Sequence, residues 1–247
     1  MVPTARRRRN LLEPMVRQRV RIRFSKSGNL KYIGHKDLLR AFESLFRRVR
    51  LPLAMSNGFH PKIRMSFPSA LALGVEGFDE VLELEFNESA PPVDPNALLA
   101  DLNRSAIGGL AFLSARRLGE REKKARLVAS VFEMTIPNEL RAQTASLIHA
   151  FLAKSSVTVA KANGKSVDVR AAVADLRFCE ESGFLRTVIL TQDGPEAGVR
   201  ELLVALELGD QYFKTIFPSR VRCHVAGEFP DEDSAMHAFP PAMKGKE

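Results

Sequence analysis

The alternation of basic and apolar residues near the start of the chain constrains the fold more than any other feature. The apolar residues are Val20, Ile22 and Phe24, and the basic residues between them are Arg19, Arg21 and Arg23. A period of two residues predicts a strand with one buried face and one basic face. Gly28 ends this strand.

The elements predicted after this strand follow a known order. Apolar residues at helical spacing predict a helix over 35–50, and Asp94-Pro95 starts a second helix with an N-cap and a proline at its first position. Alternation predicts further strands around 63–67, 82–86 and 109–117. The order β-α-β-β-α-β is the ferredoxin-like pattern.

The same order repeats after a polar link at 119–124. The predicted elements are a strand at 126–136, a helix from 137, a strand at 156–161, two segments at 168–179 and 184–191, a helix at 199–206 and a strand at 221–225. The two segments form a hairpin, or a strand preceded by a helical turn. We therefore expect an α+β fold of two tandem ferredoxin-like (βαββαβ) halves with antiparallel sheets.

These elements set the expected domain boundaries. Residues 1–17, which include Arg6–Arg9, are predicted to be a basic flexible arm, either a solubilising tail or a source of phosphate affinity. The first half is expected at 18–119 and the second at 120–227. The proline-rich, acidic segment 228–247 is predicted to be a disordered tail.

Composition excludes several classes of protein. The chain has 247 residues, of which 45% are hydrophobic, so it can bury a core, but no apolar run is long enough to span a membrane. Arg6–Arg9 is not followed by the apolar segment of a secretory signal. The two cysteines, Cys179 and Cys223, cannot build a disulfide framework, an iron–sulfur cluster or a zinc ribbon. We expect a reduced, cytoplasmic chain without a metal site.

Positive charge is concentrated in residues 21–64. This stretch holds eleven Lys and Arg against two acids, while the whole chain has a net charge of +8. A site for a large anion, most plausibly nucleic acid, is predicted here. The candidate binding residues are Lys26, Gly28, His35, Arg40, Arg47, Arg48, Ser56, Gly58, Phe59, His60, Lys62 and Arg64.

Structural roles compete with binding at several of these positions. The segment 25–28 could present amides and Lys26 to a phosphate, or it could be a plain turn, since it lacks the Walker glycines. In a ferredoxin-like sheet the first and third strands are neighbours, so the arginine face of the first strand would meet Glu83 and Glu85 in cross-strand ion pairs.

His35 and His60 are the weak candidates for catalysis. Histidine titrates near neutrality, and two histidines among lysines and arginines suit metal-independent RNA cleavage. His35 could instead simply begin a helix, and His60-Pro61 could simply shape a loop.

Six motifs over residues 20–86 resemble the DUF2344 domain of radical SAM-linked proteins. They are Arg23-Phe24-Ser25-Lys26-Ser27-Gly28, His35-Lys36-Asp37-Leu38, Arg47-Arg48-Val49-Arg50-Leu51-Pro52, Ser56-Asn57-Gly58-Phe59-His60-Pro61, Ser66-Phe67 and Leu73-Gly74-Val75-Glu76. The later Val167-Asp168-Val169-Arg170 also resembles the family pattern. His60 stands where the family more often has Asn, and 69–71 where it usually has a proline-rich segment.

The resemblance implies a partner more than a reaction. Relatives occur fused to, or encoded beside, a radical SAM protein, and this chain lacks that protein's three-cysteine motif. We expect a non-catalytic accessory module without a cofactor of its own, with the iron–sulfur cluster and S-adenosylmethionine on the partner. Its basic face would present RNA or another anionic substrate. The alternatives are an RNA-processing enzyme that uses His35 or His60 and a stand-alone RNA-binding protein.

Overall fold

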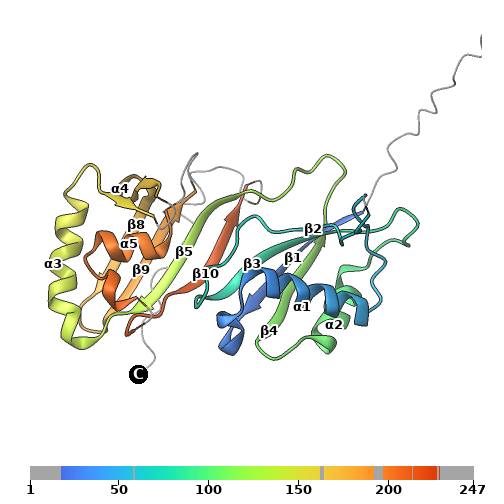
Figure 1. The fold of residues 1–247 in the computed structure, drawn as a ribbon, viewed down its shortest axis with the longest axis horizontal. Helices are drawn as coiled ribbons and strands as arrows, with labels where there is room; N and C mark the ends of the chain where they lie inside the picture. The colour runs from blue at the N-terminus through green and yellow to red at the C-terminus, as the bar shows by residue number, and fades with distance from the viewer. Residues whose placement is uncertain are drawn as a thin grey trace, which may run out of the picture.

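The computed structural model describes residues 18–57, 59–161, 164–191, 197–212, 214–226 and 228. The arm predicted at 1–17, Gly58 and the tail predicted at 228–247, except for Glu228, lie outside the described residues. The protein has an α+β fold in which a few helices cover one large, mostly antiparallel sheet (Figure 1). No helix in the described ranges combines the length and the hydropathy needed to cross a membrane.

The strands and helices follow the predicted order closely. The strands are Arg19–Lys26 (β1), Met65–Ser66 (β2), Glu76–Glu85 (β3), Leu110–Arg117 (β4), Leu127–Thr135 (β5), Thr158–Ala160 (β6), Ser166–Asp168 (β7), Val173–Cys179 (β8), Phe184–Leu190 (β9) and Ser219–Val225 (β10). The α-helices are His35–Arg48 (α1), Pro95–Ser105 (α2), Arg141–Leu152 (α3), Val169–Ala172 (α4) and Val199–Ala205 (α5), and short 3₁₀ turns are Gly28–Tyr32 (η1), Asn138–Leu140 (η2) and Gly209–Gln211 (η3).

One sheet runs through both halves of the molecule. Among the described residues, eight strands pair in the order β4-β1-β3-β10-β5-β9-β8, with β2 also beside β3. The sequence predicted separate sheets, and this part of the prediction was wrong. The strand β2 pairs with β3 only at Leu84 and Glu83, so it leaves the start of β3 available for another strand. There β10 pairs in parallel with Glu76 and Gly77.

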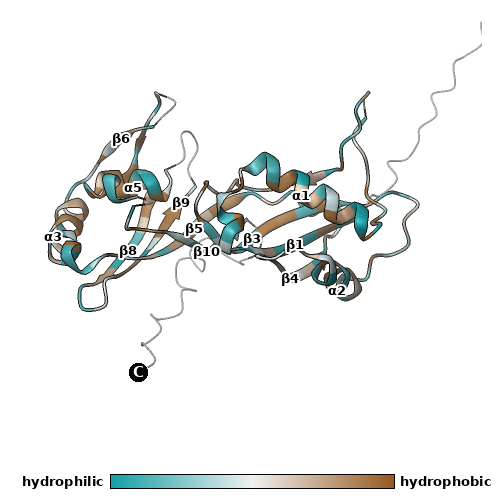
Figure 2. Ribbon diagram, turned by 60° about the horizontal axis from the view of Figure 1, so that its bottom comes forward, coloured by the Kyte–Doolittle hydropathy of each residue, from teal (hydrophilic) through white to brown (hydrophobic). Residues whose placement is uncertain are grey.

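The first half packs α1 and α2 on one face of β1 and β3. The helix α1 buries Leu38, Phe42, Leu45 and Phe46 at helical spacing, and these residues share a core cluster with the apolar residues of β1. Figure 2 shows the alternating hydropathy of the strands and the polar outer surface of α1. The helix ends before Arg50, whose φ of 57° is the left-handed conformation common after a helix.

The second half has its own core over the other end of the sheet. Phe132 and Met134 of β5 contribute to it with Phe151 of α3 and Leu203 of α5. Both alternatives for 168–191 are confirmed, since β8 and β9 pair antiparallel as a hairpin around Ser182-Gly183 and Asp168 caps the helical turn α4 directly before β8. The strand β7, which pairs with β6, was not predicted.

Candidate nucleic-acid interface

The basic face of β1 meets acidic residues of β3, as predicted. Arg19 lies opposite Glu85 and Arg21 opposite Glu83. Arg21 is only 4% exposed, and its guanidinium donates two hydrogen bonds of 3.0 Å to Oε1 of Glu83. Arg21 also pairs with Glu228 at 3.1 Å. Arg21 is therefore neutralised inside the protein and is a poor candidate for binding an external anion.

Arg23 is neutralised in the same way. Its guanidinium lies 2.7 Å from a carboxylate oxygen of Asp79, which also accepts a hydrogen bond from Arg222, and it pairs with Glu228. Burial lowers the pKa of Arg23, but the hydrogen bonds and charges of Asp79 and Glu228 outweigh it and raise the pKa overall. These contacts hold the strands β1, β3 and β10 together on this face.

The predicted residues at the end of β1 are already engaged within the protein. The ammonium of Lys26 is buried and donates to the carbonyl of Ile33 at 3.1 Å, and burial lowers its pKa. The amide of Gly28 donates to the carboxylate of Glu76 at 2.8 Å. His35 begins α1 with its ring edge-on to Phe67 at 5.4 Å between centroids. These contacts occupy the groups that a phosphate at this loop would use.

The remaining predicted residues of α1 are on its outer surface. Arg40 is exposed and pairs with Asp37 one turn earlier at 3.0 Å. Arg47 and Arg48 are exposed in the last turn, followed by exposed Arg50.

A hairpin follows α1 and carries the other predicted residues. The amide of Lys62 donates to the hydroxyl of Ser56 at 2.9 Å, and the carbonyl of Lys62 accepts from the amide of Ser56 at 2.8 Å. Phe59 is fully exposed, and His60 and Lys62 are exposed beside it. At the base of the hairpin the amide of Arg64 donates to Ala54. The hairpin therefore presents one aromatic ring and several basic groups to solvent.

The link between the halves crosses the same end of the sheet. Glu85, at the end of β3, lies 3.4 Å from Nη1 of Arg64 and 3.4 Å from Nζ of Lys124. A cleft of about 130 Å³ lies at this junction, lined by Arg19, Arg64, Met65, Ser66, Glu83, Glu85 and Lys124. The link and the hairpin, sixty residues apart in the sequence, are thus side by side.

Bringing these two segments together concentrates positive charge. Residues 47–64 contain five Lys and Arg and no acid, and residues 116–124 contain five more with Glu120 and Glu122. Glu122 forms an ion pair with Arg116 at 2.6 Å. We call this surface the basic end, which comprises Arg47, Arg48, Arg50, Lys62, Arg64, Arg117, Arg121, Lys123 and Lys124. Among the described residues, only Arg64 and Lys124 of this set form ion pairs.

Two of the predicted residues lie at opposite ends of β3. Lys26 lies opposite Gly77, whereas Arg64 lies beside Glu85, eight residues further along the strand. Eight residues of strand span roughly 26 Å. The ring of His35 packs on Phe67, and no contact among the described residues joins His35 to His60. Phe59, His60 and Lys62 belong to the hairpin that ends at Arg64, and Arg47 and Arg48 lie in the last turn of α1, which precedes it.

The contribution of the link was not predicted from the sequence. Arg121, Lys123 and Lys124 were treated as part of a polar connection at 119–124, and Arg117 as the end of the strand predicted at 109–117. The available signal was the density of basic residues in 116–124, but nothing in the sequence places this segment beside Arg64.

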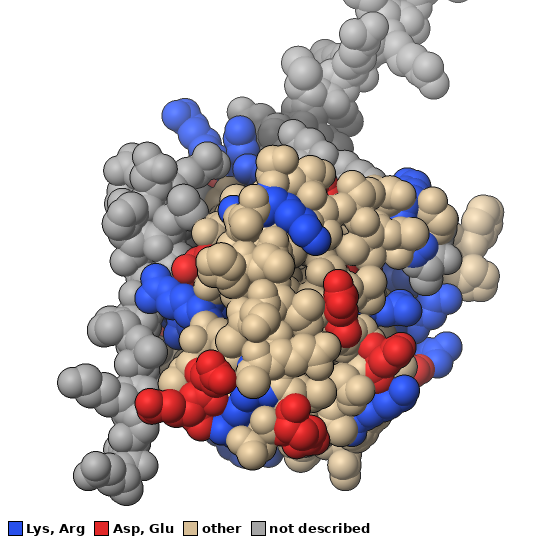
Figure 3. Space-filling model, turned by 90° about the vertical axis from the view of Figure 1, so that its left-hand side faces the viewer, with Lys and Arg blue, Asp and Glu red and all other residues tan. Residues whose placement is uncertain are grey.

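The opposite end of the molecule has a different charge distribution. Figure 3 views the second half end-on and shows Lys, Arg, Asp and Glu interspersed around a mostly uncharged centre. Within the described part of the chain, no group of three or more His, Cys, Asp or Glu is arranged to hold a metal ion.

Two comparisons with known proteins bear on this chain. No curated protein matches it. The family model of DUF2344, described as "uncharacterized protein conserved in bacteria", matches residues 19–200, about three quarters of the chain. The match includes all of the basic end, and the chain belongs to the DUF2344 family.

Proposed function

We propose that this protein is a non-catalytic binding module that holds RNA at its basic end. The observation that carries the proposal is the junction at Glu85, where Arg64 and Lys124 draw two basic segments together. One carboxylate neutralises only part of this charge, and seven further cations of the basic end have no ion-pair partner among the described residues. Clustered Lys and Arg bind phosphates by releasing counterions.

The hairpin supports single-stranded RNA as the partner. Phe59 is fully exposed between basic residues, although a large apolar side chain is normally buried. An unpaired base can stack on such a ring, while the cations nearby contact the phosphates on either side. RNA helices hide their bases and would leave Phe59 without a partner.

A separate radical SAM enzyme is the proposed protein partner. The support is the family resemblance of the motifs in 20–86, since relatives occur fused to or encoded beside a radical SAM protein. In this arrangement the partner supplies the iron–sulfur cluster and S-adenosylmethionine, and this chain supplies the RNA-binding surface.

We also infer that the two halves are tandem ferredoxin-like units. The support is the strand order, which is β4-β1-β3-β2 in the first half and β10-β5-β9-β8 in the second. In this interpretation the hairpin β6–β7 and α4 are an insertion before the second strand of the second unit. The inference places the basic end at one end of the first unit.

Fluorescence anisotropy with a labelled single-stranded RNA of about twenty nucleotides tests the proposal. The variant Arg121→Ala/Lys123→Ala removes two cations of the basic end, and Lys154→Ala/Lys214→Ala removes two exposed cations of the second half. Each phosphate that the protein no longer neutralises lowers the slope of log K against log salt by about 0.7. We expect the first variant to bind at least about fivefold more weakly at 0.1 M salt, with a shallower slope. Equal affinities for the two variants would contradict the proposal.

A further inference from the structure

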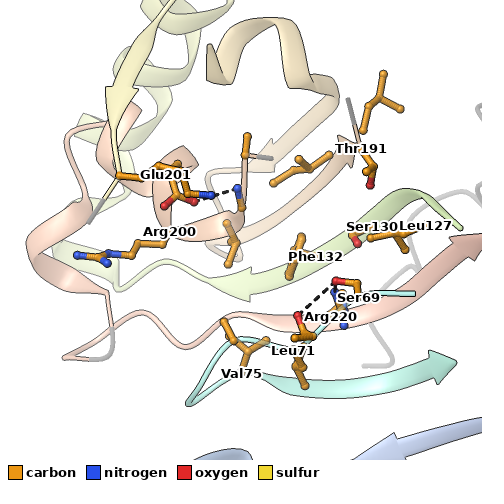
Figure 4. Close-up of a pocket in the computed structure, with 18 of the residues that line it drawn as sticks. Ser69, Leu71, Val75, Leu127, Ser130, Phe132, Thr191, Arg200, Glu201 and Arg220 are labelled. Carbon is orange, nitrogen blue, oxygen red and sulfur yellow. Dashed lines mark hydrogen bonds between the residues drawn. The ribbon is translucent and has the colours of Figure 1, made fainter. Parts of the chain in front are cut away.

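A cavity lies where the two halves meet, away from the basic end. Its volume is about 270 Å³, and it opens to solvent. One wall is the segment 69–72 with Val75, which precedes β3 in the first half. The floor and the other wall come from β5, β9 and the start of α5 (Figure 4). The cavity therefore exists only because both halves contribute to it.

The interior of the cavity is both polar and electrically balanced. Arg220 of β10 is 4% exposed, and its Nε donates to Glu80 at 2.8 Å. A second guanidinium nitrogen also bonds to Glu80, and Nη1 donates to the hydroxyl of Ser69 at 3.1 Å. Because Glu80 neutralises Arg220, the interior offers hydrogen bonds without a net charge.

Hydroxyl-bearing and apolar side chains both line this cavity. Ser69, Ser130, Thr191 and Tyr212 supply hydroxyls. The apolar walls are Leu71, Val75, Leu127, Phe132, Ile189 and Val199. Figure 4 places Ser69, Ser130 and Arg220 together, with Phe132 between them and the start of α5.

The volume and the lining restrict what can bind. At roughly 30 Å³ for each water, the cavity holds about nine waters. A nucleobase matches this lining, because it has apolar faces and hydrogen-bonding edges and is uncharged. Arg200 also lines the cavity and is exposed, and the carboxylate of Glu201 accepts from the amide of Gly198. A charged group of the ligand can therefore stay near the opening, toward Arg200.

We propose that this cavity is a second binding site, which takes a single nucleotide with its base inside and its phosphate toward solvent. The nucleotide is either free or part of an RNA chain. The inference rests on the cavity between the halves and not on the basic end, so the two sites can be tested separately.

Isothermal titration calorimetry with the four ribonucleoside monophosphates is the test, with ribose 5-phosphate as the ligand without a base. We expect at least one of the four to bind at one site with a dissociation constant below about 1 mM, and ribose 5-phosphate not to bind. Absence of binding by all four, or equal binding of ribose 5-phosphate, would overturn the proposal. A competition with a short RNA of the same base distinguishes a free nucleotide from a nucleotide within an RNA chain. If the site takes a nucleotide of an RNA chain, the RNA displaces the monophosphate.

Matched variants locate the site. Ala72→Trp places a large side chain at an exposed lining position, and Ala111→Trp places the same side chain at an exposed position of β4. Ser130→Val replaces a buried hydroxyl with methyl groups and adds one heavy atom to the side chain. We expect Ala72→Trp and Ser130→Val to weaken nucleotide binding at least tenfold, whereas Ala111→Trp leaves it unchanged. Melting temperatures without ligand establish that each variant is folded, and unchanged binding in folded Ala72→Trp and Ser130→Val would refute this location.

Discussion

Arg64 and Lys124 bind different oxygens of the same carboxylate, that of Glu85, each at 3.4 Å. This shared contact ties the hairpin after α1 to the link between the halves. It leaves the pair with a net positive charge, because two cations share one anion. The basic end is therefore a property of the folded chain, assembled from two segments that are separate in the sequence.

Neutralising the shared carboxylate should strengthen RNA binding. Glu85→Gln keeps the side chain's shape and removes the one negative charge between Arg64 and Lys124. We expect RNA affinity to rise about twofold to fivefold in low salt, and the gain to shrink as salt screens the charges. The free energy of unfolding should fall by no more than about 1 kcal/mol, because the pair is partly exposed. Fluorescence anisotropy measures the RNA affinity, and denaturant titrations measure the free energy of unfolding. Weaker RNA binding by a folded Glu85→Gln variant would count against RNA binding at this junction.

Phe59 should contribute to RNA binding without contributing to stability. Its ring is fully exposed, so Phe59→Ala should change the free energy of unfolding by less than about 0.5 kcal/mol. Loss of one stacked base should cost about 1–3 kcal/mol of binding to single-stranded RNA, and little for duplex RNA. Leu113→Ala, at an exposed position of β4, is the control. If Phe59→Ala binds single-stranded RNA as tightly as Leu113→Ala, the hairpin does not stack on bases.

His60→Asn should leave the protein's activity intact. The imidazole of His60 is exposed, whereas the ring of His35 packs on Phe67, and no contact among the described residues joins the two histidines. We expect unchanged RNA affinity and no cleavage of labelled RNA by either the parent protein or the variant. Cleavage by the parent protein that disappears in His60→Asn would support the nuclease alternative instead.

His224 should make the protein less stable in mild acid. Burial, with the charges of Arg222 and Arg23, lowers the pKa of its imidazole from 6.5 to about 4. The folded state therefore binds fewer protons than the unfolded state between these values. Above about pH 6.5 His224 should not lower the free energy of unfolding. As the pH decreases from 6.5 to 4, this free energy should fall by about 3 kcal/mol. Denaturant titrations from pH 7 to 4 should show a weaker decrease for His224→Gln, and identical profiles would exclude His224 as the cause.

The ion pair of Arg220 and Glu80 should be costly to break. Both residues are 4% exposed, so Glu80→Gln leaves a buried guanidinium without its counter-charge. We expect a loss of about 3–5 kcal/mol, because a single buried charge is poorly solvated. Replacing both partners, with Arg220→Met and Glu80→Leu, should cost clearly less than Glu80→Gln alone. A double variant less stable than the single one would contradict this explanation.

The sequence predicted the elements well because their signals are local. Alternation around Ile22 and the cap at Asp94 depend on neighbouring residues, and the structure confirms β1 and α2. The pairing of the β1 arginines with Glu83 and Glu85 was also predicted. The parallel pairing of β10 with β3 was not, because it rests on two residue pairs about 140 positions apart.

The candidate site was harder to predict from the sequence. Residues with suitable chemistry were identified, but the sequence does not show which of them are already satisfied. Lys26 and Gly28 bond to Ile33 and Glu76, contacts that depend on the folded chain. Lys124 was overlooked because only the tertiary structure places it beside Glu85.

Hydrogen–deuterium exchange with and without single-stranded RNA tests most directly whether the basic end binds RNA. We predict that RNA slows exchange in 47–64 and 116–124, the two segments that meet at Glu85, and leaves α3 of the second half unchanged. Slower exchange confined to the second half, or no change in either segment at saturating RNA, would contradict RNA binding at the basic end.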